Sequence, residues 1–353
     1  MFRVNQYIWV LIISLVSSLA LVPVARWLSF KFGVLDHPKS RKIHKEPMPT
    51  LGGLAMYAAF VIGTLSSLDY NVQLKGVLVG SSIILFVGLI DDIRHLRASI
   101  RLVAQIVASI IVISSGVVIK VFPNYYLNAI ITIIGLIGIT NALNFLDNMD
   151  GLAGGLAAIC CFGITAIAYR TSQKWLVFLS ISLLGSTLGF LRYNFKPAKI
   201  FMGDSGSTFL GFTLAAMAIM ASWSQYSIVS ITIPVLILGV MIFDTTLITI
   251  LRVVEGKVHN FREWLEHADT DHLSHRLTDL GFTQRETVMF LYICNLVLIG
   301  VAIALPKDGV KSAAIAFLGY VLLTLWGIWK LHDVKCRHHK MKPKLTEPQS
   351  SRR

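Results

Sequence analysis

The sequence predicts an all-α, polytopic membrane protein, and three observations carry that prediction. Of its 353 residues, 55% are hydrophobic and only 14% are charged, which leaves few polar side chains to cover the surface of a soluble domain. The apolar residues fall in runs of about 20, the length of helix that crosses about 30 Å of hydrocarbon. Lysine and arginine are concentrated between alternate runs, as in the cytoplasmic loops of membrane proteins.

We expect about eleven transmembrane helices, one for each apolar run. Six basic residues and ten further runs follow the first run, so we expect it to be retained as a helix rather than cleaved as a signal peptide. The predicted spans are 7–25, 51–68, 74–90, 99–119, 126–142, 151–169, 175–191, 207–223, 228–251, 288–305 and 312–331.

The distribution of basic residues predicts the orientation. If the N-terminus lies outside, 25 of the 32 lysines and arginines fall in cytoplasmic segments, as the positive-inside rule requires. We therefore expect an N-out, C-in protein. The net charge of +13 follows from this topology and from attraction to anionic lipid headgroups, so it does not call for a nucleic-acid partner.

The domain organisation is expected to be simple. Residues 1–335 are predicted to form one transmembrane catalytic domain, and 336–353 a basic cytoplasmic tail. The four cysteines, Cys160, Cys161, Cys294 and Cys336, have no spacing typical of a metal site or a disulfide framework.

Acidic residues gather at the predicted cytoplasmic ends of the spans. Asp91 and Asp92 close the third span, Asp147 and Asp150 lie between the fifth and sixth, and Asp204 precedes the eighth. A carboxylate at membrane depth is costly and is usually paired or functional. A divalent cation would reconcile several acids on one face, because Mg²⁺ prefers oxygen ligands and commonly joins carboxylates to substrate phosphates. We therefore expect a cytoplasmic active-site cleft that binds Mg²⁺, with Mn²⁺ as an alternative.

The stretch NALNFLDNMDGLAGG, residues 141–155, places a polar residue at every third position, at Asn141, Asn144, Asp147 and Asp150. Successive residues at this spacing drift around a helix, so one straight helix cannot present all four equally. We expect the asparagines to end the fifth span, Asp147 to lie in a turn and Asp150 to open the sixth span. The alternative is that Asp150 is only an N-cap and the asparagines satisfy helix-end carbonyls.

Other polar positions have a structural alternative as well. Asp204 lies in Gly-Asp-Ser-Gly-Ser, which suits either an anion-binding helix start or a simple cap. His272 and His275 are either ligands or surface loop residues. Asp244, within the ninth span, is either functional or a paired acid that serves packing.

These motifs, in this order, resemble a known family. PMPTLGG at 47–53, Asp91-Asp92, the 141–155 stretch, FMGDSGS at 201–207 and the histidine motif near 272 are similar to those of the polyprenyl-phosphate N-acetylhexosamine-1-phosphate transferases. This superfamily, glycosyltransferase family 4, includes phospho-MurNAc-pentapeptide translocase. The resemblance runs from about residue 36 to 280, and the number of predicted spans also fits the family.

The resemblance implies a reaction. A member of this family transfers a sugar-1-phosphate from a UDP-sugar to a polyprenyl phosphate, giving a polyprenyl-diphospho-sugar and UMP, with Mg²⁺ required. The sequence His272-Leu-Ser-His275-Arg276 looks more like the branch that uses UDP-GlcNAc and undecaprenyl phosphate to initiate a cell-envelope glycan, such as lipopolysaccharide or teichoic acid. Phospho-MurNAc-pentapeptide transfer is the alternative. Either activity implies a bacterial plasma membrane protein; a homodimer is left open.

The resemblance also implies roles for single residues. Position 148 is Asn where the family usually has Gly, and Asn also tolerates left-handed backbone conformations. The implied metal ligands are Asp204 and Asp150, the implied catalytic residues are Asp91, Asp92, Asp147 and Asp150, and the implied substrate-binding residues are Lys45, Thr50, Asn141, Asn144, His272, His275 and Arg276.

An ion-coupled secondary transporter is the remote alternative from another functional class, because intramembrane acids also mark ion paths. A transporter would place acids near mid-membrane and on both sides of the bilayer. Here only Asp244 is predicted to be deep, and the outer loops hold only Asp69 and Asp308. The pattern favours phosphoryl transfer at one face.

Overall fold

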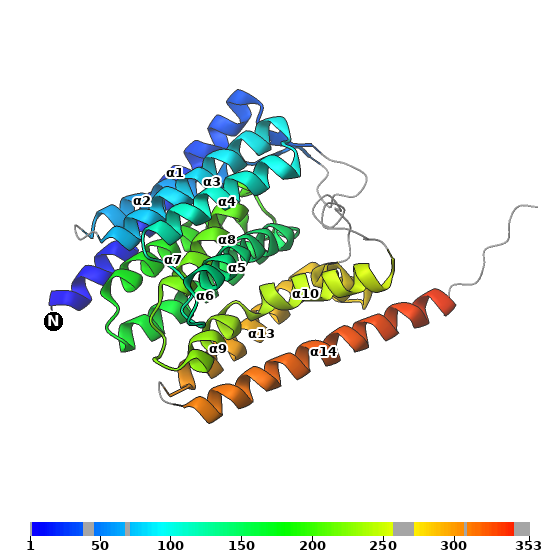
Figure 1. Ribbon diagram of the computed structural model, residues 1–353. Coiled ribbons are helices and arrows are strands. Elements are labelled where there is room, and N and C mark those ends of the chain that lie inside the picture. Colours follow the sequence, from blue (N-terminus) through cyan, green and yellow to red (C-terminus); the bar gives the residue numbers. More distant parts are fainter. Residues whose placement is uncertain (1, 38–45, 68–70, 257–271, 307–308, 342–353) are drawn as a thin grey trace, which may run out of the picture.

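The computed structural model describes residues 2–37, 46–67, 71–256, 272–306 and 309–341, and within them the chain is almost entirely helical (Figure 1). The all-α prediction is confirmed, except for one antiparallel ribbon that pairs Leu35 with Pro49 and Asp36 with Met48. The elements are α1 (Phe2–Phe32), β1 (Leu35–Asp36), β2 (Met48–Pro49), α2 (Gly52–Leu65), α3 (Val72–Arg94), α4 (Ala98–Ser114), α5 (Tyr125–Leu146), α6 (Leu152–Arg170), α7 (Lys174–Asn194), α8 (Gly203–Met220), α9 (Ser227–Ile237), α10 (Gly239–Val254), α12 (Leu273–Asp279), α13 (Gln284–Ala304) and α14 (Val310–Met341).

Seven helices of the described chain are long and apolar enough to cross a membrane, or eight if the bent pair α9 and α10 counts as one span. A polytopic α-helical membrane protein is therefore confirmed. The second and fourth predicted spans are the shorter apolar helices α2, with 14 residues, and α4, with 17. The total of eleven spans and the N-out, C-in orientation stay predictions. The tail predicted from residue 336 also stays a prediction, because helix α14 continues through that position to Met341 and marks no boundary there.

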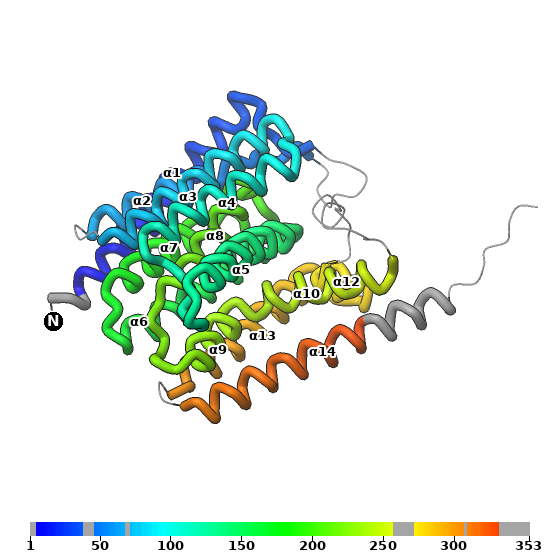
Figure 2. The backbone as a smooth tube through the Cα atoms, viewed as in Figure 1, coloured from blue at the N-terminus to red at the C-terminus, as the bar shows by residue number. Residues whose placement is uncertain are grey.

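Helix α8 forms the centre of the bundle and packs against α2, α3, α5, α6 and α7 (Figure 2). Every residue from Ser205 to Ala218 is buried. Small residues allow this close packing: a Cβ atom on Gly53 of α2 would lie 2.3 Å from the Cα atom of Gly206, and one on Gly88 of α3 would lie 2.5 Å from the Cα atom of Ser205. The start of α8 is thus enclosed by neighbouring helices.

The predicted ninth span is broken. Helices α9 and α10 meet at Leu238 with a bend of 82°, whereas the sequence pattern predicted one span over 228–251. Pro234 lies one turn before the break and has no N–H to continue the helical hydrogen bonds. The Tyr320 hydroxyl on α14 donates to the Gly239 carbonyl at 2.8 Å, which satisfies a backbone group at the bend. The break changes the direction of α10, which carries Asp244.

Candidate active site

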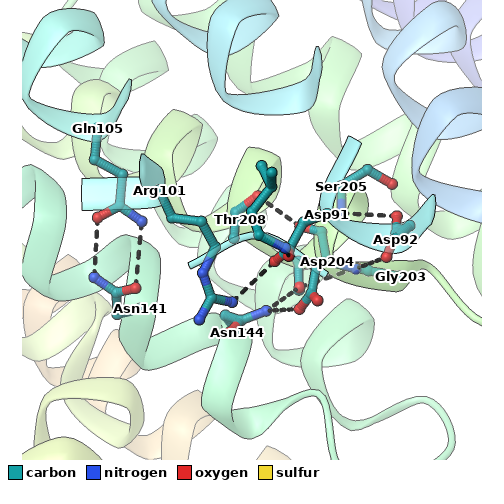
Figure 3. Close-up of polar contacts among 12 residues, drawn as sticks. Asp91, Asp92, Arg101, Gln105, Asn141, Asn144, Gly203, Asp204, Ser205 and Thr208 are labelled. Atoms are coloured by element: carbon teal, nitrogen blue, oxygen red, sulfur yellow. Dashed lines mark hydrogen bonds and ion pairs between the residues drawn. The ribbon is translucent and has the colours of Figure 1, made fainter. Parts of the chain in front are cut away.

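A small pocket lies between α3, α4, α5 and α8, and four of the predicted site residues line it (Figure 3). Its volume is about 20 Å³, room for roughly one water molecule or ion. The pocket is lined by Ile84, Val87, Gly88, Asp91, Arg101, Ala104, Gln105, Asn141, Asn144, Asp204 and Thr208.

Asp91 forms one wall of the pocket through an ion pair. Its carboxylate is 4% exposed and lies 3.0 Å from Nη1 of Arg101, whose side chain is 34% exposed. It also accepts a hydrogen bond from the backbone N–H of Leu96. The left-handed residue His95 caps the end of α3 and turns the chain, so that Arg101, in the first turn of α4, faces Asp91 in the last turn of α3. A cation and a carboxylate therefore border the same pocket.

Asp92 points to the start of α8 instead. Its two oxygens accept from the backbone N–H groups of Asp204, at 2.7 Å, and Ser205, at 3.1 Å (Figure 3). The N-cap residue of α8 is Met202, which cannot cap the helix with its side chain. The Asp92 carboxylate fills that role, since the first N–H groups of a helix lack partners and favour a negative charge. Asp92 thus fixes the position from which Asp204 projects.

Gly203 makes this junction sterically feasible. Its φ of +71° is a conformation that side chains other than glycine rarely adopt. A Cβ atom at this position would also lie 2.5 Å from Oδ2 of Asp92 and 2.7 Å from the Thr50 carbonyl oxygen. The glycine before Asp204 is therefore required both by the backbone conformation and by the closeness of Asp92.

The PMPTLGG and FMGDSGS motifs meet at the same junction. The Phe201 N–H donates to the Pro49 carbonyl at 2.8 Å, the Gly52 N–H donates to the Phe201 carbonyl at 3.1 Å, and the Gly53 N–H donates to the Met202 carbonyl at 2.9 Å. Thr50 is buried, and its hydroxyl donates to the Val34 carbonyl at 3.2 Å. These backbone contacts hold the chain before Asp204 in place.

Asn144 joins α5 to the acid on α8. Its amide nitrogen donates to Oδ1 of Asp204 at 2.7 Å and lies 2.8 Å from the hydroxyl of Ser207 (Figure 3). Burial raises the pKa of the Asp204 carboxyl, the hydrogen bond from Asn144 opposes that shift, and the nearby charge of Asp91 adds to it. Two carboxylates in one small pocket therefore repel each other.

Asn141 lines the pocket with its amide already paired. It exchanges two hydrogen bonds with the Gln105 amide, at 3.1 and 3.3 Å, and donates to the Ile137 carbonyl at 2.9 Å. The pair links α4 to α5 beside Asp91 and Asp204 (Figure 3). Substrate binding by Asn141 stays a prediction.

Asp147 and Asp150 occupy the turn between α5 and α6. The pKa of the Asp147 carboxyl is raised to about 8, first by burial and then by the negative charges of Asp204, Asp92 and Asp150. Asp150 accepts from the Ala198 N–H at 3.1 Å. The simple N-cap alternative for Asp150 is wrong, because the N-cap residue of α6 is Gly151, in a left-handed conformation with no side-chain cap. Asp147 is therefore close enough to the pocket for the charge of Asp204 to affect its pKa.

The donor set fits a hard cation that substrate helps to hold. In the part of the chain that the structure describes, no group of three or more His, Cys, Asp or Glu residues surrounds a metal position. Mg²⁺ is commonly bound by one or two carboxylates together with water and substrate phosphates, and Asp91 and Asp204 supply two carboxylates beside one pocket. A cation there would relieve the repulsion between them. Asp150 as a further ligand stays a prediction.

The histidine motif forms the short helix α12. Nδ1 of His272 lies 3.0 Å from Oδ2 of Asp244, so this intramembrane acid is paired; the contact is compatible with both a functional and a packing role. His275 is half-buried, and burial followed by the proximity of His272 lowers its pKa. Arg276 is buried. Lys45, predicted to bind substrate, lies outside the described residues.

Comparison of this sequence with known proteins supports the family that the order of its motifs indicated. The family model for glycosyl transferase family 4 matches residues 74–222. A probable undecaprenyl-phosphate N-acetylglucosaminyl 1-phosphate transferase of Bacillus subtilis (strain 168) is 34% identical to this chain over 333 residues, which covers 92% of this chain and 90% of the relative. This chain belongs to glycosyl transferase family 4. The family resemblance predicted from the motifs is therefore confirmed.

Two further relatives are more distant members of the family. A decaprenyl-phosphate N-acetylglucosaminephosphotransferase of Mycobacterium tuberculosis (strain ATCC 25618 / H37Rv) is 30% identical over 88% of this chain and 86% of its own length. An undecaprenyl-phosphate alpha-N-acetylglucosaminyl 1-phosphate transferase of Escherichia coli (strain K12) is 25% identical over 79% of this chain and 78% of its own length. All three relatives are named as sugar-phosphate transferases.

Sequence reasoning missed two residues of this family 4 site. Arg101 and Gln105 follow the Asp91-Asp92 pair, lie four residues apart and therefore share one face of α4. That spacing, just after two acids, is the signal that could have identified them. Asn148, where the family usually has Gly, does not adopt a left-handed conformation, because among the described non-glycine residues only His95 and Ser172 have positive φ. Asn148 instead accepts a hydrogen bond from the Ser274 hydroxyl at 2.8 Å.

Proposed function

We propose that this family 4 protein transfers N-acetylglucosamine-1-phosphate from UDP-GlcNAc to undecaprenyl phosphate, giving undecaprenyl-diphospho-GlcNAc and UMP. The observation that carries the proposal is the meeting of Asp91 and Asp204 at one small pocket, beside Arg101. The relative from Bacillus subtilis, which matches nearly the whole chain, is named for this lipid and this sugar. Together they favour phosphoryl transfer over the secondary transporter.

The reaction exchanges one phosphorus–oxygen bond for another. An oxygen of the lipid phosphate attacks the β-phosphorus of UDP-GlcNAc, and the bond from that phosphorus to the bridging oxygen breaks. The bridging oxygen leaves as part of UMP, and the GlcNAc-phosphoryl group remains on the lipid. Catalysis of such a transfer depends mainly on positioning the two phosphates and on stabilising their charge.

The residues of the pocket suit these two tasks. Arg101 can bind an oxygen of the attacking phosphate, because a guanidinium recognises phosphate through several N–H donors. Asp91 holds that guanidinium at 3.0 Å and so orients the attacking group. Asn144 donates to Oδ1 of Asp204 at 2.7 Å and so fixes the orientation of the carboxylate that would hold a cation.

Mg²⁺, or Mn²⁺ in its place, is proposed to bind at Asp204 with Asp91 and Asp150 nearby, and when bound it would supply positive charge to the diphosphate oxygens. Asp147 lies close enough to these acids for their charges to raise its pKa, so a cation bound among them would also act on Asp147. Asp92 acts on the site through the backbone of α8. We assign it a positioning role.

The environment of the pocket suits a lipid acceptor. Asp91 and Asp92 lie at the end of α3, one of the seven helices long enough to span a membrane, so the phosphate of a membrane lipid could reach them while its tail stays among apolar helices. We place this end of the bundle at the cytoplasmic face of a bacterial plasma membrane, on the basis of the basic residues that follow α3.

A purified-protein assay tests the proposal. The protein in detergent is incubated with undecaprenyl phosphate and Mg²⁺, and with UDP-GlcNAc, UDP-GalNAc or UDP-MurNAc-pentapeptide in separate reactions. We expect UDP-GlcNAc to give UMP and lipid-linked GlcNAc in equal amounts, and EDTA to abolish both. Faster turnover of UDP-MurNAc-pentapeptide, or UMP release without the lipid, would contradict the proposal.

A further inference from the structure

A second buried carboxylate lies outside the pocket of Asp91 and Asp204. Asp244, on α10, is 0% exposed, and both of its oxygens are used. Oδ2 lies 3.0 Å from Nδ1 of His272, and Oδ1 accepts from the backbone N–H of Leu273 at 2.7 Å. Because an acid buried among apolar helices is costly without such partners, these contacts hold the start of α12 against α10.

The same contacts define the state of the His272 ring. If Asp244 accepts this hydrogen bond, as a carboxylate does, Nδ1 of His272 carries the hydrogen. The ring also lies against Phe145 on α5, with the two ring centroids 5.6 Å apart. With Nδ1 bound to Asp244, Nε2 is the ring nitrogen that remains for a ligand.

Helix α12 is tied to the acidic turn as well. The Ser274 hydroxyl donates to Oδ1 of Asn148 at 2.8 Å, and Asn148 lies between Asp147 and Asp150. His272 therefore stands between Asp244 on α10 and the turn that bears two of the acids.

Building on the proposed function, we propose that Asp244 is a positioning residue for the transfer reaction. It holds His272 through Nδ1–H and provides the counter-charge that lets the ring carry a second hydrogen, so that Nε2–H donates to the diphosphate of the UDP-sugar. Asp244 contacts no substrate in this account and acts only through His272.

The substitution Asp244→Asn separates this role from a purely structural one. Asparagine keeps the size of the side chain, and its oxygen can still accept from the Leu273 N–H. Its amide group, however, would face Nδ1 of His272 as a hydrogen-bond donor, and its lack of charge would no longer favour the doubly protonated ring. If Asp244 served only to anchor α12, the substitution would leave the kinetics almost unchanged.

The kinetic test measures kcat and KM for UDP-GlcNAc in wild type, Asp244→Asn, His272→Gln and the double variant. We expect each single variant to lower kcat/KM by at least about tenfold and the double variant to match His272→Gln within about twofold, since both remove the same interaction. Thr246→Val is the matched control, because Thr246 lies on the same helix and its hydroxyl donates to the Ile242 carbonyl of that helix. An Asp244→Asn enzyme within about twofold of wild type, or losses that multiply, would overturn the proposal.

A measurement that needs no turnover makes the two proposals distinguishable. In ¹⁵N nuclear magnetic resonance spectra of histidine-labelled protein, the Nδ1 signal of His272 is identified by its absence from His272→Gln. We expect this nitrogen to carry a hydrogen in the folded wild type. A bare Nδ1 would refute the role of Asp244 even if the enzyme is active, and a wild type that is inactive with UDP-GlcNAc would refute the proposed function instead.

Discussion

The starts of α8 and α12 are built alike, yet they act on the site differently. In each, a carboxylate from an earlier helix binds the first turn of a later one. Both oxygens of Asp92 accept hydrogen bonds from backbone N–H groups, those of Asp204 and Ser205. Asp244 instead accepts from one backbone N–H, that of Leu273, and pairs with the ring of His272. The first contact sets the position of a functional side chain through the main chain, and the second sets the chemical state of one directly.

The surroundings of the two helices reinforce the difference. Helix α8 is buried along nearly its whole length, and five other helices pack on it. Helix α12 has seven residues, and Asp279 at its end is exposed. Changes at the start of α8 should therefore cost both stability and activity, while changes around α12 should mainly alter kinetics.

The largest effect is expected from Gly203→Ala, which breaks the α8 junction outright. Alanine must adopt a φ of +71° with its Cβ atom 2.5 Å from Oδ2 of Asp92. We expect a loss of at least about 2 kcal/mol of stability and transfer below detection, measured by thermal unfolding in detergent and by UMP release. Gly138→Ala on α5 is the control, since nothing lies within 4 Å of its added Cβ; equal behaviour of the two variants would contradict this account of the junction.

Asp92→Asn should have the next largest effect. Asparagine keeps one acceptor oxygen for the two N–H groups of α8 and loses the charge that favours a helix start, so we expect about 1–2 kcal/mol less stability. Displacement of Asp204 should slow transfer by about 100-fold. Asp244→Asn, measured beside it, should slow transfer with a smaller change in unfolding temperature. The reverse order of stability losses would show that the two junctions have been assigned wrongly.

Arg101→Gln sharpens the comparison by changing the pocket without touching either junction. Its guanidinium is partly exposed and pairs with Asp91, so the fold should tolerate the loss. We expect kcat/KM for undecaprenyl phosphate to fall by about tenfold, with partial recovery in Arg101→Lys, whereas KM for UDP-GlcNAc should change less. A loss confined to UDP-GlcNAc would assign Arg101 to the other substrate.

The smallest effect is expected from Ser274→Ala, which removes the hydrogen bond from α12 to Asn148. The net contribution of such a bond is about 1 kcal/mol, which corresponds to a decrease in kcat of about fivefold at most. Steady-state kinetics beside Asp244→Asn provide the measurement. If Ser274→Ala lowers kcat more than Asp244→Asn does, the hydrogen bond from Ser274 to Asn148 contributes more to the position of His272 than Asp244 does.

The sequence predicts the helical membrane architecture and most of the site, because apolar run length and the order of motifs are local properties. The meeting of Asp91, Asn144 and Asp204 agrees with the prediction that polar residues of the third, fifth and eighth spans gather at one end of the bundle. The function of Asp92 could not be predicted, because its partners lie more than a hundred residues away and are backbone groups. The bend at Leu238 was missed because run length alone does not distinguish one helix from two, although Pro234 within the run is a helix-breaking residue.

Asp204 provides the most direct test of the central claim that its carboxylate, delivered by the start of α8 and held by Asn144, is part of the reacting centre. The decisive measurement is the rate of lipid-dependent UMP release from UDP-GlcNAc with Mg²⁺, for wild type and for Asp204→Asn with an unchanged unfolding temperature. We expect the rate to fall by at least about 1,000-fold, the order of effect when a group that stabilises transition-state charge is removed. A folded Asp204→Asn protein that retains a tenth or more of the wild-type rate would contradict the account.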